Sequence, residues 1–383
     1  MGIASALSPM GVTMIVPTLG LVADTYSADF AVVQFLVSAY LLGLGAGQPF
    51  HGFLCDLLGR RSVLLVGFGL FVVASFACIF VDNLTLLIVF RFLQALGVSV
   101  GTVASRAVVR DTRGPTGTAV ALSYIAVAQG ISPIIAPMLG GWLGALGGIE
   151  LVFVLMTVLG FGAWLAMYLA LPETLPPEIP RPNWSDWLGN YGKLLGTPSF
   201  VGYTLIFGFV QGSFFAFLAV GAGFFDKQFG LGPAQFGTLW GFLAITYVLG
   251  ATFGARMTQA KGPDIVLKSG VVVTLIGGWL MLILTQALGV TLVTVLLPMV
   301  VLMSVAGLVT PGSLAGAVNS RPEIAGTSSG LSSAVGIVVG GSFTVMAGFI
   351  YKDDFTPVAV LICVSATLTA LSWLLVRGDE IVK

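Results

Sequence analysis

Charged residues are scarce in this chain, and their scarcity excludes a soluble globular protein. Only 8% of the 383 residues are Asp, Glu, Lys or Arg, whereas 57% are hydrophobic. A soluble domain has about a quarter of its residues charged. The composition therefore predicts a membrane protein with many spans, and the formal net charge of zero gives no reason to expect a nucleic-acid partner.

Histidine and cysteine are nearly absent as well. With His51 as the single histidine, a metal centre or a Ser-His-Asp site would have to form without its usual side chains. The three cysteines, Cys55, Cys78 and Cys363, suggest no disulfide framework. The chain also lacks the G-x-x-x-x-G-K-[ST] phosphate loop. These absences argue against an enzyme, a cofactor site and transport driven by ATP.

Long apolar runs fill most of the chain. A membrane helix needs about 20 apolar residues, and uninterrupted runs such as residues 271–285 lack the alternation of a transmembrane β-barrel. We therefore predict an all-α integral membrane protein with twelve transmembrane helices. The expected spans are residues 2–22, 30–51, 62–81, 84–107, 118–146, 150–171, 199–223, 234–256, 266–285, 288–316, 325–350 and 356–377.

Basic residues divide unequally between the two sides of this predicted topology. Lys227 and Lys352 fall outside, and Arg91 falls within a span. The positive-inside rule then places both termini in the cytoplasm. The basic residues on the cytoplasmic side are Arg60, Arg61, Arg106, Arg110, Arg113, Arg181, Lys193, Arg256, Lys261, Lys268, Arg321, Arg377 and Lys383.

A proline-rich connector separates two halves of six spans each. We predict an N-terminal six-helix bundle at residues 1–171, a cytoplasmic linker at 172–198 and a C-terminal six-helix bundle at 199–383. Residues 172–182 should be extended, and residues 184–195 have the pattern of an interfacial amphipathic helix. A weak repeat supports the two halves, because Gly-Thr opens the helix after the fourth span at Gly117 and again after the tenth at Gly326.

The connector between the second and third spans, residues 52–61, reads GFLCDLLGRR. It resembles the signature loop of the major facilitator superfamily, roughly G-x-x-x-D-x-x-G-R-[RK]. Other segments resemble the drug-efflux branch of the Bcr/CflA type. They are residues 34–40 (QFLVSAY), 91–97 (RFLQALG), 106–111 (RAVVRD), 136–141 (APMLGG), 171–174 (LPET) and 325–331 (AGTSSGL).

The resemblance implies two pseudo-symmetric bundles with a substrate site between them. It also implies a latch that closes the cytoplasmic side, in which Asp56 faces the start of the eleventh helix, where free N–H groups favour an anion. Gly52 and Gly59 would permit close approach and a tight turn. Alternatively, Arg60 and Arg61 only set the topology. The expected latch residues are Gly52, Asp56, Gly59, Arg60, Arg61, Arg110, Asp111, Gly326 and Thr327.

Arg91 is a cation within a predicted span. Such a residue costs about 2.5–3.5 kcal/mol on insertion scales unless it faces a partner or a polar cavity. It should point inward, with Gln94 on the same helical face. The family resemblance ties similar arginines to coupling of protons or substrate. A structural bond to a backbone carbonyl is the alternative.

Further candidates for substrate contact lie on several helices. Phe207, Gln211, Phe214 and Phe215 should form one aromatic face of the seventh helix with a single amide. Ordinary packing is the competing role for every candidate. Weaker cavity candidates are Thr13, Tyr40 and Gln129. Residues expected to let a helix bend are Gly130, Pro133, Pro137, Gly140 and Gly141.

No carboxylate remains in the middle of a predicted span. Many relatives place an acid in the first helix, where this chain has Thr13. A helix-end acid such as Asp24 or Asp29 would then have to titrate, or the proton would travel with the substrate. Uncoupled transport is a third possibility.

We therefore expect a monomeric secondary transporter in a bacterial inner membrane that works by alternating access. Its substrates would be amphiphilic drugs exported by proton antiport. The alternative is a carrier for a specific small anionic or zwitterionic metabolite, possibly uncoupled. A channel is a further alternative, which single-channel currents would reveal.

Overall fold

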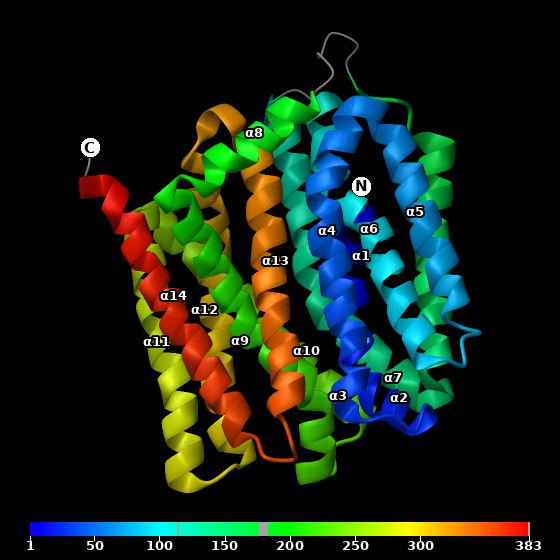
Figure 1. The fold of residues 1–383 in the computed structure, drawn as a ribbon, viewed down its shortest axis with the longest axis vertical. Helices are drawn as coiled ribbons and strands as arrows, with labels where there is room; N and C mark the ends of the chain where they lie inside the picture. Colours follow the sequence, from blue (N-terminus) through cyan, green and yellow to red (C-terminus); the bar gives the residue numbers. More distant parts are fainter. Residues whose placement is uncertain (113–114, 176–182, 382–383) are drawn as a thin grey trace. The chain divides into compact units, whose positions relative to one another are not determined.

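The computed structural model describes residues 1–112, 115–175 and 183–381, and this part of the chain contains helices and no strands (Figure 1). The expected extended stretch lies mostly outside the described part, at residues 176–182. The long helices are α4 (Phe35–Leu58), α5 (Arg60–Ala77), α6 (Leu84–Thr112), α7 (Pro115–Ala170), α9 (Pro198–Phe229), α10 (Pro233–Lys261), α11 (Pro263–Leu288), α12 (Leu292–Asn319), α13 (Ala325–Ile350) and α14 (Thr356–Ile381). The short ones are α1 (Gly2–Thr13), η1 (Val16–Thr18), α2 (Leu19–Thr25), α3 (Phe30–Val33), α8 (Trp184–Leu195) and η2 (Pro322–Ile324).

Eleven segments of the described chain are long and apolar enough to cross a membrane, and one of them contains two spans. Within α7, Gly147 and Gly148 leave the helical conformation, and Gly148 has φ of +72°. Only glycine adopts such a backbone readily, so the chain turns there. The all-α fold with twelve spanning helices is thus confirmed.

The first span is broken rather than continuous. α1 ends at Thr13, and the chain continues through η1 into α2. Pro17 has no N–H group to donate to the carbonyl of Thr13, which explains the interruption. The expected single helix over residues 2–22 is corrected accordingly.

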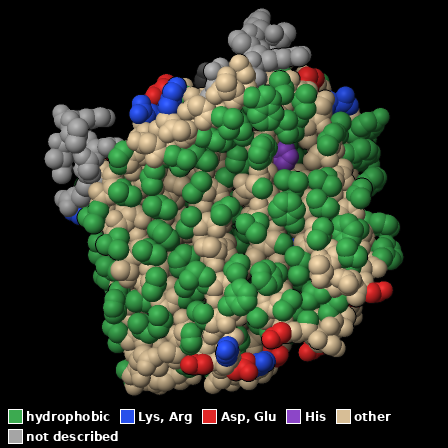
Figure 2. Space-filling view, in the orientation of Figure 1, with side chains coloured by type: hydrophobic (Ala, Val, Ile, Leu, Met, Phe, Trp, Pro, Cys, Tyr) green, Lys and Arg blue, Asp and Glu red, His purple; other side chains and the backbone are tan. Residues whose placement is uncertain are grey.

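Two compact units make up the chain, namely Met1–Gly189 with Leu231–Thr238 and Asn190–Gly230 with Leu239–Lys383. The boundary falls inside α8, so the exact predicted limits at residues 171 and 199 stay a prediction. In each unit taken by itself, hydrophobic side chains cover the flanks of the helices and charged side chains lie at helix ends (Figure 2).

Glycines allow neighbouring helices to approach closely inside each unit. A Cβ atom at Gly47 of α4 would lie 2.1 Å from Ser99 Oγ on α6, and one at Gly336 of α13 would lie 2.0 Å from the Phe207 ring on α9. Small residues at such contacts are the usual basis of helix packing in membranes.

The predicted linker helix is confirmed as α8. In the first unit, the ring of Trp184 lies 4.1 Å from that of Phe53 on α4, and Trp187 packs on Phe50 and Phe53. In the second unit, buried Leu194 joins a cluster with Phe200, Ala317 and Leu331. Its position at a membrane surface stays a prediction.

Candidate functional site

Gly59 separates α4 from α5, and Arg60 is the first residue of α5. Gly59 has φ of +98°, a conformation that favours glycine. The buried guanidinium of Arg60 forms an ion pair with Asp56 in the last turn of α4. Its Nε also donates to Asp111 Oδ2 at the end of α6, at 3.1 Å. The loop is thus connected to the end of α6 through a shared arginine.

The other basic residues of the expected latch behave differently. Arg61 donates from Nη2 to the carbonyl of Tyr168 at 2.9 Å, and its guanidinium lies 5.9 Å from the Tyr168 ring centre. Arg110 is exposed and forms no ion pair with the described residues, so Arg60 rather than Arg110 neutralises Asp56. A Cβ at Gly52 would make ordinary contact with Val103, at 3.6 Å. The close approach expected at Gly52 is therefore not present.

Gly326 and Thr327 occupy the first turn of α13. This agrees with the expected helix start, where free N–H groups point away from the helix. They belong to the second unit, whereas Asp56 belongs to the first. Their pairing stays a prediction.

Arg91 is fully buried, and neutral groups surround its guanidinium. Nη2 donates to the carbonyl of Gly11 on α1 at 2.8 Å, and Nε donates to that of Leu36 on α4 at 3.4 Å. Nη1 donates to Gln94 Oε1, and the Tyr40 ring centre lies 4.1 Å from the guanidinium carbon. The predicted inward orientation and the shared face with Gln94 are both observed.

A second layer of contacts fixes the groups around Arg91. Gln94 Nε2 donates to Ser75 Oγ on α5 at 2.6 Å, which orients its oxygen toward the arginine. The hydroxyl of Tyr40 donates to the carbonyl of Ser8 on α1 at 3.2 Å. Arg91 therefore joins α1, α4 and α6 without a carboxylate.

The break in the first span lies next to the glycines of α7. A Cβ at Gly140 would lie 1.8 Å from the carbonyl oxygen of Met14, so only glycine fits there. Thr13 is buried and donates its hydroxyl back to the Pro9 carbonyl at 3.2 Å. The Thr13 hydroxyl is thus already hydrogen-bonded within its own helix.

The remaining predicted residues of α7 are mostly engaged in packing. Gln129 donates to Ser5 Oγ on α1 at 2.7 Å. A Cβ at Gly141 would lie 2.3 Å from the Pro233 carbonyl, whereas a Cβ at Gly130 would meet nothing within 4 Å. Pro133 and Pro137 lie within α7, whose non-helical residues are Gly147 and Gly148. Bending at these prolines stays a prediction.

The four candidates on α9 contact two neighbouring helices. Phe207, Gln211 and Phe215 pack against the glycines Gly336 and Gly340 of α13. Phe214 lies about 100° around the helix from Phe215. Its ring lies 5.4 Å from that of Trp240 on α10. The Phe214 and Phe215 rings lie 5.1 Å apart, so the aromatic side chains stay in contact while they face two neighbouring helices.

Phe214 borders a small pocket inside the second unit, between α9, α11 and α12. Ser213 and Thr274 supply hydroxyl groups there, and the buried Ser213 hydroxyl has no hydrogen-bond partner among the described residues. The space admits about one water molecule, so it is too small for a drug. The other lining residues are Val210, Met299, Leu302, Met303 and Ala306.

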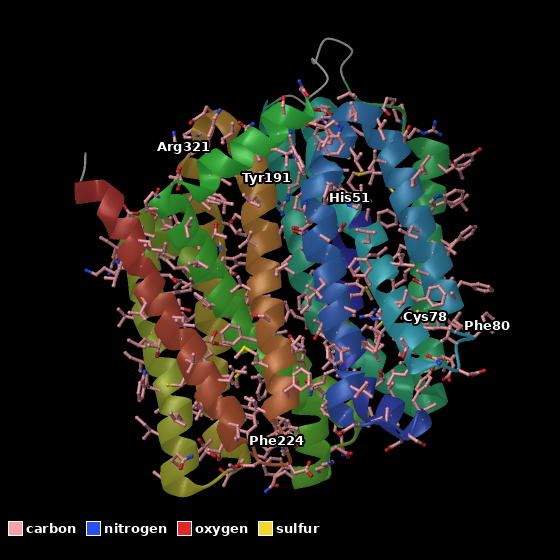
Figure 3. All side chains as sticks on the ribbon, viewed as in Figure 1. His51, Cys78, Phe80, Tyr191, Phe224 and Arg321 are labelled. Atoms are coloured by element: carbon pink, nitrogen blue, oxygen red, sulfur yellow. The ribbon has the colours of Figure 1, made fainter. Side chains whose placement is uncertain are left out.

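The acidic side chains of the described chain lie near helix ends. No Asp or Glu among the described residues lies more than about one turn inside a spanning helix. His51 is half-buried on α4, with Nδ1 2.8 Å from Ser99 Oγ (Figure 3). The described spans therefore enclose a buried arginine, about two turns inside α6, but no carboxylate.

Comparison with models of protein families shows the family to which the chain belongs. A sequence model described as Major Facilitator Superfamily matches residues 1–345, which is most of the protein. The chain belongs to the major facilitator superfamily.

Several relatives within the superfamily extend over nearly the whole chain. Multidrug resistance protein D of Escherichia coli is 27% identical over 96% of this chain and 92% of its own length. The Chloramphenicol resistance protein of Pseudomonas aeruginosa is 28% identical over 94% of this chain and 86% of its own. An uncharacterized transporter of the superfamily from Bacillus subtilis, YdgK, is 28% identical over 97% and 93%.

Solved structures agree with this membership at the level of the fold. A D-xylose–proton symporter superposes with a TM-score of 0.75 at 13% identity, covering 96% of this chain and 95% of its own. The human organic anion transporter MFSD10 gives a TM-score of 0.72 at 18% identity, covering 98% and 97%. Its membership of the superfamily and its similarity to curated transport proteins make this major facilitator protein a membrane transporter, not an enzyme.

Sequence reasoning missed one residue of the signature-loop region in this major facilitator protein. Glu173, in the LPET segment after the sixth span, lies with its carboxylate at the start of α5. An acid directly after a span is a visible signal. The sequence does not indicate which helix it reaches, because 113 residues separate Glu173 from Arg60.

Proposed function

We propose that this protein is a secondary active transporter that exports amphiphilic drugs in exchange for protons by alternating access. The observation that carries the proposal is its similarity, over at least 94% of the chain, to proteins named for multidrug and chloramphenicol resistance. Both termini would lie in the cytoplasm, since most basic residues then face that side.

In this proposal, residues 52–61 close the cytoplasmic side. Arg60 holds Asp56 and Asp111 together within the first unit. Asp56, whose side chain is 44% exposed, would also accept from the first turn of α13 in the closed state. The proton would be carried by a helix-end acid or with the substrate, because the described spans have no mid-membrane carboxylate.

A carrier for a small anionic or zwitterionic metabolite is the second candidate. The environment of Arg91 favours it, because all the guanidinium contacts are neutral and leave the positive charge uncompensated. Such a charge attracts an anion in a medium of low dielectric constant. A carrier of this kind does not require proton coupling.

Drug susceptibility in an efflux-deficient host, paired with proton flux in everted membrane vesicles, tests the first proposal. We expect cells with the parent protein to tolerate several amphiphilic drugs, and those drugs to dissipate a preformed pH gradient in the vesicles. The exposed variant Lys193→Met should behave like the parent. Absence of resistance and of proton flux across a broad panel would sink the drug-antiporter proposal, and uptake of small anions without proton flux would favour the second candidate.

A further inference from the structure

The carboxylate of Glu173 caps a helix that begins more than a hundred residues earlier in the chain. Oε1 accepts from the backbone N–H of Arg60 at 2.9 Å, and Oε2 accepts from that of Arg61 at 3.2 Å. These are among the N–H groups at the start of a helix that have no carbonyl partner within it. Glu173 thus replaces the local cap that α5 lacks.

The same carboxylate organises its own segment of chain. Oε1 also accepts from the N–H groups of Thr174 at 2.9 Å and Leu175 at 3.0 Å. Burial alone would raise the pKa of Glu173, but the four backbone N–H groups outweigh it and lower the pKa below its ordinary value. The group is therefore an anion at neutral pH, the charge that a helix N-terminus favours.

Gly59 provides the space that this carboxylate occupies. A Cβ atom at Gly59 would lie 2.4 Å from Glu173 Oε2. The glycine is thus required for its backbone conformation, with φ of +98°, and for the approach of Glu173. The two requirements are separable, because only the second depends on Glu173.

Fixing the first turn of α5 also fixes the residues that leave it. Arg60, the first residue of α5, directs its guanidinium to Asp56 and Asp111. Arg61, the second residue, donates to Tyr168, which lies five positions before Glu173. The start of α5 is therefore held from α4, from α6 and from the end of the sixth span.

We propose that Glu173 is a positioning residue of the transport cycle, which holds Arg60 between Asp56 and Asp111 and fastens the first residues after the sixth span to the signature loop. Glu173 acts through the α5 backbone and contacts neither substrate nor proton. Its effect on rate rests on the proposed transport function, whereas its anchoring of α5 does not.

Hydrogen exchange tests the anchoring directly in the purified full-length protein. Glu173→Ala should accelerate exchange of the amides of Arg60 and Arg61, and Glu173→Gln, which retains one acceptor oxygen, should have a smaller effect. The control is Glu150→Gln, which removes an exposed carboxylate of the same unit that accepts no hydrogen bond from the described residues. Unchanged exchange of both amides in Glu173→Ala would overturn the anchoring even if the protein transports no drug.

Transport kinetics test the consequence. Glu173→Ala should lower the maximal rate severalfold and leave KM nearly unchanged, because Arg60 is no longer held between Asp56 and Asp111 while no contact with substrate is lost. Glu150→Gln should match the parent in both. If the parent transports a drug and Glu173→Ala keeps its full maximal rate, the positioning role is excluded while the proposed function stands.

A double variant separates positioning from general damage. Gly59→Ala displaces the carboxylate, so Glu173→Ala and Gly59→Ala remove one shared interaction. In the Glu173→Ala background, Gly59→Ala should retain only its backbone strain, and the combined loss should be smaller than the product of the single losses. Fully multiplicative losses would show that Glu173 and Gly59 act independently, against the proposal.

Discussion

Two buried arginines of the first unit solve the same electrostatic problem in opposite ways. Arg60, with its side chain 4% exposed, lies between two carboxylates, those of Asp56 and Asp111. Arg91, with no exposure, is held by backbone carbonyls, the amide of Gln94 and the ring of Tyr40.

The two sites differ in whether the buried charge is paired with a charge of opposite sign. A buried ion is tolerated when it is paired and its hydrogen bonds are satisfied. At Arg60 the carboxylates provide both conditions. At Arg91 the hydrogen bonds are satisfied but the charge is not, so the site keeps an attraction for an anion. The first arrangement suits a structural joint and the second suits coupling to a substrate.

The largest effect is expected from removing the charge at Arg91. Arg91→Met leaves the Gln94 amide oxygen without its donor and deletes hydrogen bonds from a charged group, which are worth about 1.5–3 kcal/mol each. We expect transport to fall at least about tenfold at equal membrane abundance. Arg91→Lys keeps the charge but not the planar fork, so it should be intermediate.

Initial rates of drug efflux, normalised to protein in the membrane, measure this effect. Lys193→Met, which removes an exposed cation of α8, is the matched control. Parent-like transport by Arg91→Met would reduce Arg91 to a structural bond between helices.

A second effect, on stability rather than on transport, is expected at Arg60, and it can be reversed. Arg60→Gln leaves Asp111, with its side chain only 7% exposed, as a buried anion without a cation. Breaking a buried pair in this way costs about 3–5 kcal/mol. Adding Asp111→Asn removes the stranded charge and should recover most of the lost stability.

Thermal unfolding in detergent compares the parent, Arg60→Gln and the double variant. A double variant no more stable than Arg60→Gln would contradict the ionic account of this cluster. No corresponding rescue by removal of a carboxylate exists for Arg91, because no carboxylate of the described residues contacts it.

The smallest effect is expected from lowering the pH, which should reduce the stability that Glu173 gives to the start of α5, next to Arg60. The backbone N–H groups lower the pKa of Glu173. Its stabilising contribution is therefore complete above the ordinary carboxylate pKa of about 4.3 and is lost as pH falls through the lowered value. The difference in Tm between parent and Glu173→Gln should be constant from about pH 7 to pH 5 and should shrink below about pH 4. A difference that grows in acid would reverse the assigned sign.

Local patterns predicted the parts of the site that depend on spacing along one helix. Arg91 and Gln94 are three residues apart on α6, so their shared face followed from helical geometry. The pairing of Arg60 with Asp56 crosses the turn at Gly59 between α4 and α5, so it does not follow from spacing along one helix. The neighbours of the α9 aromatics were not predictable, because they belong to α10 and α13, which lie far away in the sequence.

Contacts between distant segments explain the remaining differences. Arg110 and Asp111 were both expected in the latch, yet only Asp111 forms an ion pair with Arg60 in the described chain. The break after Thr13 had a local signal in Pro17. The close contact of this break with Gly140 could not be read from the sequence, because it depends on how the first span packs against α7.

The sequence by itself determined that the protein lies in a lipid bilayer, how many times it spans the bilayer and to which family it belongs. Scarcity of charge and runs of about 20 apolar residues leave internally bonded helices as the main solution in lipid. The tertiary structure alone decided which groups surround each buried charge. A guanidinium is satisfied by carboxylates or carbonyls from any helix that packs beside it, and that choice is made by packing rather than by sequence distance. Glu173 and Gly59 are the clearest example, since an acid after the sixth span completes the start of the third.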